Sequence, residues 1–97
     1  IVVVLNSAHT VIASPNGKIC INTTGTSAMR KGGSGDSLTG VITGLIAQGL
    51  KPFDSACLGT YLNGKSGEIA EKKLSSYSVM ATDISDCICD AINDILA

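Results

Sequence analysis

A glycine-rich run, Gly32-Gly33-Ser34-Gly35-Asp36, opens directly into the apolar-periodic stretch of residues 38–48. Because glycine has no Cβ, such a run adopts unusual φ values and lets a ligand approach the backbone closely. The N-terminus of the helix that follows carries unpaired N–H groups and the positive end of the helix dipole, which together favour an anion, with phosphate the first candidate. The run therefore predicts a loop that enters a helix and forms an anion site.

Asp36 is the unusual member of this run, since a carboxylate repels an anion unless it acts as a base on a group beside it. A plain turn with an acidic helix cap is the alternative, and a short glycine motif alone leaves both open. Two nucleotide signatures are absent. No Gly-x4-Gly-Lys-Ser/Thr stretch is present, and Gly33-x-Gly35 lacks the third glycine of the dinucleotide fingerprint.

The order of the apolar patterns predicts an α/β fold. Residues 1–5 are apolar without alternation, which is typical of a strand covered on both faces in a parallel sheet. Residues 10–13 and 18–21 flank Ser14-Pro15-Asn16-Gly17, a hairpin turn signal. Three helical patterns follow, over residues 38–48, 52–74 and 84–95. A parallel neighbour needs a crossover connection that this order does not offer, so we expect residues 1–97 to be the C-terminal part of one larger domain.

Several glycines within the helical patterns carry more specific predictions. Gly40 and Gly44 form a small-residue face that predicts close approach of another helix or strand. Gly49 predicts the end of the first helix, and Pro52 suits the first turn of the second. Near Gly64 we expect a kink or a close contact.

Charge and composition argue against two classes of partner. The net charge is −1 and the basic residues are scattered, so no nucleic-acid footprint is present. The aromatic residues are too few for base stacking; they are Phe53, Tyr61 and Tyr77. The most apolar stretch, residues 41–50, is interrupted and too short to span a membrane.

Cysteine and acidic residues predict no metal site. Cys20, Cys57, Cys87 and Cys89 form no Cys-x-x-Cys pair, and His9 is the one histidine. We expect buried or half-buried thiols in a reducing, cytoplasmic compartment. The acids of the last helical pattern predict a solvated face; they are Asp83, Asp86, Asp90 and Asp94.

Taken together, the segments resemble the C-terminal third of ribokinase-like proteins, and within them the ADP- or ATP-dependent NAD(P)H-hydrate dehydratases. The segments that carry the resemblance run nearly end to end: Val2-Val3-Val4-Leu5, Asn6-Ser7-Ala8-His9-Thr10, Asn22-Thr23-Thr24-Gly25, Gly32-Gly33-Ser34-Gly35-Asp36-Ser37-Leu38-Thr39-Gly40, Ala47-Gln48-Gly49, Tyr61-Leu62-Asn63-Gly64 and Ala81-Thr82-Asp83-Ile84. The resemblance implies a ribokinase-like three-layer sandwich, of which this chain supplies a strand, a β-hairpin and three helices.

The resemblance also implies a metabolite-repair activity. Such enzymes dehydrate hydrated NADH or NADPH, with ADP or ATP as co-substrate and Mg²⁺: the nucleotide phosphorylates the ring hydroxyl, and phosphate then leaves. The implied partners are these small molecules and the N-terminal remainder of the domain, in a homo-oligomer.

Site residues follow by the same resemblance. Asp36 would contact the substrate and take its hydroxyl proton, while the N–H groups of Gly33, Ser34 and Gly35 would hold the phosphates. Nucleotide contacts are implied for the segment that follows the first strand, at the edge where open α/β sheets bind ligands: Asn6, Ser7, Ala8, His9 and Thr10. A catalytic role is not expected for His9, and no residue is assigned to the metal.

The chain departs from the family pattern at two places, and these keep other functions open. Asn6-Ser7 stands where the family has Lys-Gly, and Ser27-Ala28 where it has Pro-Gly. The missing lysine leaves the choice of nucleotide open, and Arg30 and Lys31 are candidates to supply compensating charge. A ribokinase-like kinase for a vitamin precursor or sugar is one alternative function, and a non-catalytic nucleotide-binding module is another.

Overall fold

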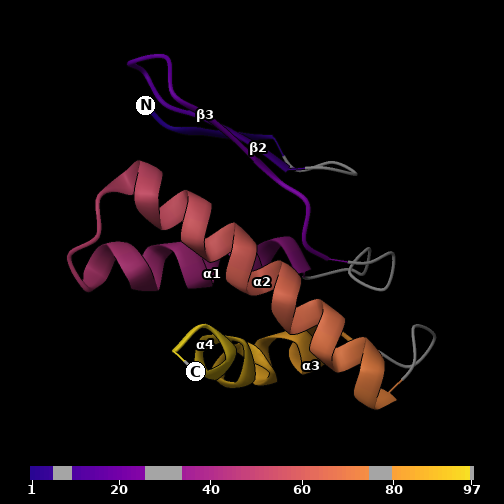
Figure 1. The fold of residues 1–97 in the computed structure, drawn as a ribbon. Coiled ribbons are helices and arrows are strands. Elements are labelled where there is room, and N and C mark those ends of the chain that lie inside the picture. The colour runs from indigo at the N-terminus through magenta and orange to yellow at the C-terminus, as the bar shows by residue number, and fades with distance from the viewer. Residues whose placement is uncertain (6–9, 26–33, 75–79, 97) are drawn as a thin grey trace.

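The computed structural model describes residues 1–5, 10–25, 34–74 and 80–96. Its elements are three strands followed by four helices, shown in Figure 1: β1 (Val3–Leu5), β2 (Thr10–Ala13), β3 (Ile19–Asn22), α1 (Ser34–Ala47), α2 (Pro52–Leu74), α3 (Ala81–Asp86) and α4 (Ile88–Leu96). The predicted order of a strand, a hairpin and then helices is confirmed, with one more helix than the sequence pattern predicts.

The three strands form one antiparallel sheet in the order β1-β2-β3. Strands β2 and β3 pair with Thr10 opposite Asn22, which confirms the predicted hairpin. The prediction that the neighbours of the first strand come from elsewhere is wrong in part. Strand β1 pairs antiparallel with β2, Leu5 opposite Val11, because so few residues separate the two strands that β2 can fold straight back along β1.

The two faces of this sheet have opposite environments. The face that carries Ile12 packs toward α2, and Ile12 is fully buried. Alternate residues point to the other face. There Val3, Leu5, Ile19 and Ile21 are exposed by 49–69%. Within the described residues the first strand is therefore covered on one face, although its sequence predicts cover on both.

Helix α2 begins and ends as local signals predict, whereas α1 begins at Ser34, four residues before the predicted stretch 38–48, because Ser34-Gly35-Asp36 is itself helical. Gly49 has φ +104°, and Leu50 N–H bonds to the Leu45 carbonyl at 3.2 Å, so the chain leaves α1 through a left-handed residue. Helix α2 begins at Pro52 and extends to Leu74, the range predicted from the sequence.

The third predicted helix is divided in two at Cys87, which has φ −89° and ψ 0°. The Cys87 N–H contacts the carbonyls of both Asp83 and Ile84 at 3.2 Å, and α4 begins with the next residue. Ile84 and Ala91 are both buried, so the apolar period continues across the break. No glycine or proline marks this position, and the sequence therefore gives no sign of the division.

The elements form layers, as Figure 1 shows: the sheet lies along one side of α2, and α3 and α4 lie on the other, beside α1 and α2. A small core joins α2 to the last helices and consists of Ala70, Ile84 and Cys87, with Ile69 packed against it. Helix α2 is the central element, and its buried residues are mostly small: Ser55, Ala56, Gly59, Thr60, Leu62, Asn63, Gly64, Ser66, Gly67 and Ala70.

Glycine predictions for the two long helices have different outcomes. A Cβ built at Gly40 or Gly44 would meet nothing within 4 Å among the described residues, so the predicted close approach does not occur there. It occurs on α2 instead. A Cβ at Gly59 would lie 2.7 Å from Ile42 Cγ1 of α1, and Gly64 lies against Thr24. The close contact expected near Gly64 is confirmed.

The four cysteines are free thiols. Cys87 is buried and Cys20 and Cys57 are half-buried as predicted, but Cys89 is exposed on α4, so that part of the prediction is wrong. Burial, together with a hydrogen bond to Cys20, raises the pKa of Cys57 to about 11. The two thiols therefore face each other between β3 and α2. Across the described helices, none combines the length and apolarity needed to cross a bilayer.

Candidate functional site

The sheet brings the ends of β1 and β3 and the start of β2 together at the same end of the three strands. In the antiparallel ladder, Leu5 at the end of β1 lies opposite Val11, and Thr10 at the start of β2 lies opposite Asn22 at the end of β3. Residues 6–9 connect Leu5 to Thr10, and residues 22–25 lead from the same end toward the glycine-rich run. The topology therefore attaches both segments with predicted ligand contacts to one end of the sheet.

The predicted site residues fall partly outside the described ranges. Asn6, Ser7, Ala8, His9 and Gly33 lie outside them, as do Arg30 and Lys31. Thr10 is described and is 7% exposed at the start of β2. Ser34, Gly35 and Asp36 form the first turn of α1, so the predicted passage from glycine run to helix is found in the structure.

The first turn of α1 has the features of an open anion site. The first N–H groups of any helix, here those of Ser34 and Gly35 among them, have no carbonyl partner within the helix. A Cβ at Gly35 would have no heavy atom within 4 Å among the described residues, so the backbone there is accessible. The Asp36 side chain is exposed in the same turn. N–H donors without a partner inside the helix and an exposed carboxylate are thus adjacent.

A polar contact that the sequence analysis missed joins this turn to two other helices. The Ser37 hydroxyl lies 2.7 Å from the Ser85 hydroxyl of α3 and donates to Asn63 Oδ1 of α2 at 3.5 Å. Asn63 is 5% exposed. Within α1, Thr39 Oγ1 donates to the Gly35 carbonyl at 3.0 Å. Two side chains that follow Asp36 in the sequence, those of Ser37 and Thr39, are therefore held by hydrogen bonds.

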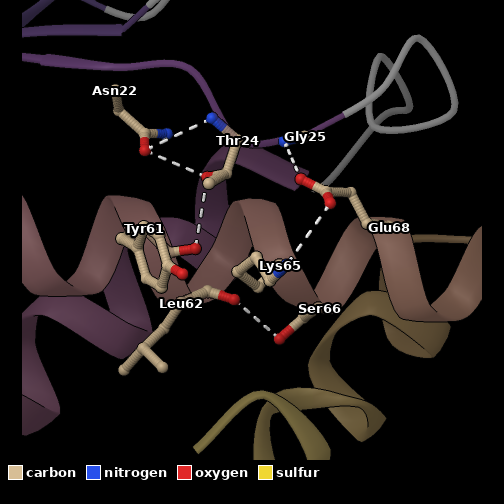
Figure 2. Close-up of polar contacts among 8 residues, drawn as sticks. All are labelled: Asn22, Thr24, Gly25, Tyr61, Leu62, Lys65, Ser66 and Glu68. Carbon is tan, nitrogen blue, oxygen red and sulfur yellow. Dashed lines mark hydrogen bonds and ion pairs between the residues drawn. The ribbon is translucent and has the colours of Figure 1, made fainter. Parts of the chain in front are cut away.

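A second polar cluster, also missed, holds the segment that follows β3 against α2 (Figure 2). Thr24 Oγ1 lies 3.0 Å from Asn22 Oδ1 and 3.2 Å from the Tyr61 carbonyl. The Gly25 N–H donates to Glu68 Oε2 at 2.8 Å, and Lys65 pairs with Glu68 at 3.6 Å. A signal was present in the segments Asn22-Thr23-Thr24-Gly25 and Tyr61-Leu62-Asn63-Gly64, which both belong to the resemblance, but their mutual contact was not predicted.

The charged groups near the end of α2 form pairs of their own. Lys73 Nζ lies 2.9 Å from Asp90 Oδ2 of α4, and the hydrogen bond to Asp90 raises the pKa of Lys73. At the start of α3, Asp83 accepts the Met80 N–H at 2.8 Å. In the described ranges no three His, Cys, Asp or Glu side chains lie together as a metal cage would need.

Comparison with known proteins gives consistent results. The family described as NAD(P)H-hydrate dehydratase matches residues 1–90. The bifunctional NAD(P)H-hydrate repair enzyme Nnr of Moorella thermoacetica is 48% identical over 85 residues, which are 88% of this chain and 16% of that protein. The ADP-dependent (S)-NAD(P)H-hydrate dehydratase of Bacillus subtilis is 37% identical over 87 residues, which are 90% of this chain and 32% of that protein.

A solved structure has the same fold. The ADP/ATP-dependent NAD(P)H-hydrate dehydratase from Bacillus subtilis, co-crystallized with ATP/Mg²⁺, superposes with a TM-score of 0.90 at 34% identity. The superposition covers 96% of this chain and 34% of that one. It confirms the predicted fold class.

The chain spans between 16% and 34% of the length of these three proteins. The matched part contains the strand edge, the glycine-rich run and the two anchored segments described above. On the family match over residues 1–90 and the shared fold, the chain belongs to the NAD(P)H-hydrate dehydratase family.

Proposed function

We propose that the complete natural polypeptide dehydrates hydrated NADH or NADPH, using ADP or ATP as the phosphoryl donor. The observation that carries this proposal is the first turn of α1, where an exposed carboxylate stands beside backbone N–H groups that have no partner within the helix, in a chain of this family. A protein that only binds phosphate gains nothing from a carboxylate there, because like charges repel. The carboxylate is explained if Asp36 is the base that deprotonates the hydroxyl group that accepts the phosphoryl group.

The chemistry assigned to these residues is a proton transfer and an anion contact. The ring hydroxyl oxygen attacks the terminal phosphorus of the nucleotide, the bond from that phosphorus to the bridging oxygen breaks, and Asp36 takes the hydroxyl proton. The N–H groups of Gly33, Ser34 and Gly35 stabilise the charge on the transferred group. The ring C–O bond then breaks with its electron pair on phosphate, and loss of a proton from the adjacent carbon restores the dihydronicotinamide.

We assign the nucleotide contacts to Asn6, Ser7, Ala8, His9 and Thr10. The support is topological: residues 6–9 join Leu5 to Thr10, and both of these lie at the sheet edge from which the glycine-rich segment departs. Ligands bind at such edges in open α/β folds. Asn6 in place of the family lysine predicts weaker phosphate binding than in relatives that have the lysine.

Magnesium is proposed to enter with the nucleotide. Mg²⁺ commonly keeps several waters and binds through phosphates and one or two carboxylates, so it does not need a protein cage. Phosphate oxygens and waters would supply most of its ligands in that mode, so we assign no described side chain to the ion, and Asp36 keeps its proposed role as the base. When bound, the ion would neutralise phosphate charge.

We also propose that residues 1–97 are part of a single ribokinase-like domain whose remainder covers the outer face of the sheet. The support is the row of exposed apolar side chains on that face, together with the share of the Bacillus subtilis structure that this chain does not span. A cytoplasmic location accords with the four free cysteines. A homo-oligomer remains a prediction, which light scattering of the purified protein would measure.

The assay supplies the complete polypeptide with hydrated NADH, Mg²⁺ and either ADP or ATP, and follows recovery of the reduced nicotinamide absorbance. Turnover is expected with at least one nucleotide. No recovery with either would exclude the dehydratase, and accumulation of a phosphorylated product without elimination would indicate a small-molecule kinase instead.

The role of Asp36 is tested with a matched pair of variants. Asp36→Asn is expected to lower kcat by ~10³-fold while nucleotide binding by calorimetry is retained, since general-base catalysis supplies this order of rate. Asp54→Asn is the control, because Asp54 is the exposed acid in the first turn of the neighbouring α2. Near-normal turnover of Asp36→Asn would show that Asp36 is not the base.

A further inference from the structure

Helix α2 contacts the chain on both sides of the glycine-rich segment. Gly25 is the last described residue before residues 26–33, and α1 begins directly after them at Ser34. Thr24 and Gly25 on one side, and Ser37 on the other, all contact residues of α2 between Tyr61 and Glu68. One stretch of two helical turns therefore holds the chain both before residues 26–33 and after Asp36.

Residues 22–25, which precede the glycine-rich run, are held to α2 by three hydrogen bonds whose partners are 37 to 43 residues apart in the sequence. Asn22 Nδ2 donates to the Thr60 carbonyl at 3.3 Å, and Thr24 Oγ1 donates to the Tyr61 carbonyl at 3.2 Å. The strongest of them is the bond from the Gly25 N–H to the Glu68 carboxylate at 2.8 Å, because its acceptor is charged. Figure 2 shows Glu68 reaching toward Gly25 from α2.

Gly64 makes this approach possible. A Cβ at position 64 would lie 2.0 Å from Thr24 Oγ1 and 2.8 Å from the Thr24 backbone carbonyl carbon. Any side chain there would push the segment away from α2 and break the bonds on either side of it. Gly25 itself has φ +110°, a conformation that side chains rarely adopt. Backbone geometry and the Glu68 bond therefore both fix the position of Gly25 against α2.

The start of α1, on the other side of residues 26–33, contacts the same helix between Tyr61 and Glu68. Asn63 Oδ1 accepts from Ser37, the residue after Asp36, and the Ser37 hydroxyl also contacts Ser85. Gly59 packs against Ile42 of α1, so the backbones of α1 and α2 approach closely near this bond. The start of α1 therefore has a fixed place relative to Gly25.

We propose that Glu68 is a positioning residue for the reaction: by accepting from the Gly25 N–H it holds the chain against α2 ahead of the glycine-rich run, and this anchor and the Ser37 contact together set where Asp36 and the N–H groups of Ser34 and Gly35 meet the phosphates. The inference rests on the proposed function. The carboxylate does not touch the substrate. It acts through the backbone, and misplacement of reacting groups by about 1 Å is enough to cost ~100-fold in rate.

Three variants separate this role from simple packing. Glu68→Ala removes the acceptor and is expected to lower kcat by ~10-fold or more, with a smaller change in the KM for the nucleotide. Glu68→Gln keeps an acceptor oxygen at the same reach and loses the charge, so it is expected to restore most of the rate. Asp90→Asn is the matched control, since it also removes a carboxylate paired with one lysine of α2 but makes no described contact with residues 22–25.

A second measurement does not depend on activity. Hydrogen exchange of the Gly25 amide is expected to be slow in the wild type and in Glu68→Gln, and at least ~10-fold faster in Glu68→Ala, because the amide loses its acceptor. Ser37→Ala loosens the start of α1 and should lower kcat without changing Gly25 exchange.

The outcomes distinguish the two proposals. If the wild-type protein shows no turnover, the proposed function fails, while Gly25 exchange still reports whether Glu68 holds the segment. If the wild type is active and folded Glu68→Ala has the same kcat, Glu68 is not a positioning residue. An equal loss in Glu68→Ala and Asp90→Asn, with matching drops in Tm, would likewise overturn the inference in favour of general stability.

Discussion

The outer face of the sheet and the buried face of α2 reverse the usual distribution of side chains. The sheet exposes large apolar residues, with Ile19 at 69% and Ile21 at 61%, whereas α2 buries Ser55, Thr60 and Ser66 almost completely. Exposed apolar patches and buried polar groups are the two departures that carry information about a fold. The two regions therefore serve different purposes.

Two of the four buried polar residues of α2, Thr60 and Ser66, bond within their own helix. Thr60 Oγ1 donates to the Ala56 carbonyl at 2.6 Å and Ser66 Oγ to the Leu62 carbonyl at 2.8 Å. Such bonds satisfy the hydroxyls without a partner from another element. Small side chains then allow close approach by β3, by residues 22–25 and by α1. In contrast, the sheet has a layer of apolar side chains that its own chain leaves uncovered in the described ranges.

The largest effect is expected from the buried side of the sheet. Ile12→Ala should destabilise the complete polypeptide by about 2–5 kcal/mol, because Ile12 is fully buried and its loss leaves a cavity. If the remainder of the domain covers the outer face, Ile21→Ala should cost nearly as much, although Ile21 is 61% exposed in this chain. Chemical denaturation of both variants measures the two values.

A much smaller destabilisation by Ile21→Ala than by Ile12→Ala would contradict the proposed cover of the outer face. A change within about 0.5 kcal/mol for Ile21→Ala, as exposed positions usually show, would mean that the outer face is uncovered in the complete protein. Ile12→Ala is the internal control, since it must destabilise in either case.

A somewhat smaller effect is expected on α2. Gly64→Ala should destabilise by about 1–3 kcal/mol, because its Cβ would overlap Thr24 at 2.0 Å. Gly44→Ala on α1 is the matched control: nothing lies within 4 Å of its Cβ among the described residues, and alanine in a helix interior is favoured by ~0.5–1 kcal/mol. Thermal unfolding should therefore move in opposite directions for the two variants.

Equal destabilisation by both substitutions would contradict the assignment of close approach to α2 alone. It would indicate that a part of the protein outside the described residues packs against Gly44, as the sequence pattern of Gly40 and Gly44 predicts.

Much of the local structure was predictable because its signals span a few residues. Pro52 and Gly49 mark helix ends, Asn16-Gly17 marks the hairpin, and the run before Ser34 marks the start of α1. Two features of the element order were not predicted. The division at Cys87 preserves the apolar period, so no pattern reveals it, and the pairing of β1 with β2 follows from the short connection between them and not from the apolar run itself.

The sequence predicts the residues of the candidate site but not the contacts that hold them. The glycine run makes Asp36 and Gly35 candidate site residues, and the collection of segments indicates the family, which the comparisons confirm. The contacts were not predicted, because Gly25 and Glu68 are 43 residues apart and Ser37 and Ser85 are 48 apart. A single sequence shows which residues are small or polar, but long-range partners follow from packing. Gly64 illustrates this, because the sequence predicts a close contact near it and the structure identifies Thr24 as the partner.

The smallest expected effect concerns the thiols between the two regions. Cys20 lies on the inner face of the sheet, opposite Ile12 in the ladder, and Cys57 faces it from α2. Burial and the Cys20 hydrogen bond raise the pKa of Cys57 from 9.0 to about 11, so the thiolate that reacts with iodoacetamide is scarce at pH 8. Exposed Cys89 should label several-fold faster there, as mass spectrometry of the native protein would measure.

The pH profile of that labelling tests the contact between the sheet and α2. A folded pKa above the unfolded value means that the protonated thiol stabilises the fold fully below pH 9 and that this contribution is lost as the pH rises toward about 11. The Cys57 labelling rate should therefore keep rising across this interval. In Cys20→Ala, which removes the hydrogen bond but leaves the burial, the profile should shift toward lower pH. A wild-type profile that levels off near pH 9 would show that Cys57 is not enclosed between the sheet and α2. The sheet would then be held to α2 chiefly by Ile12 and by the contact of Thr24 with Gly64.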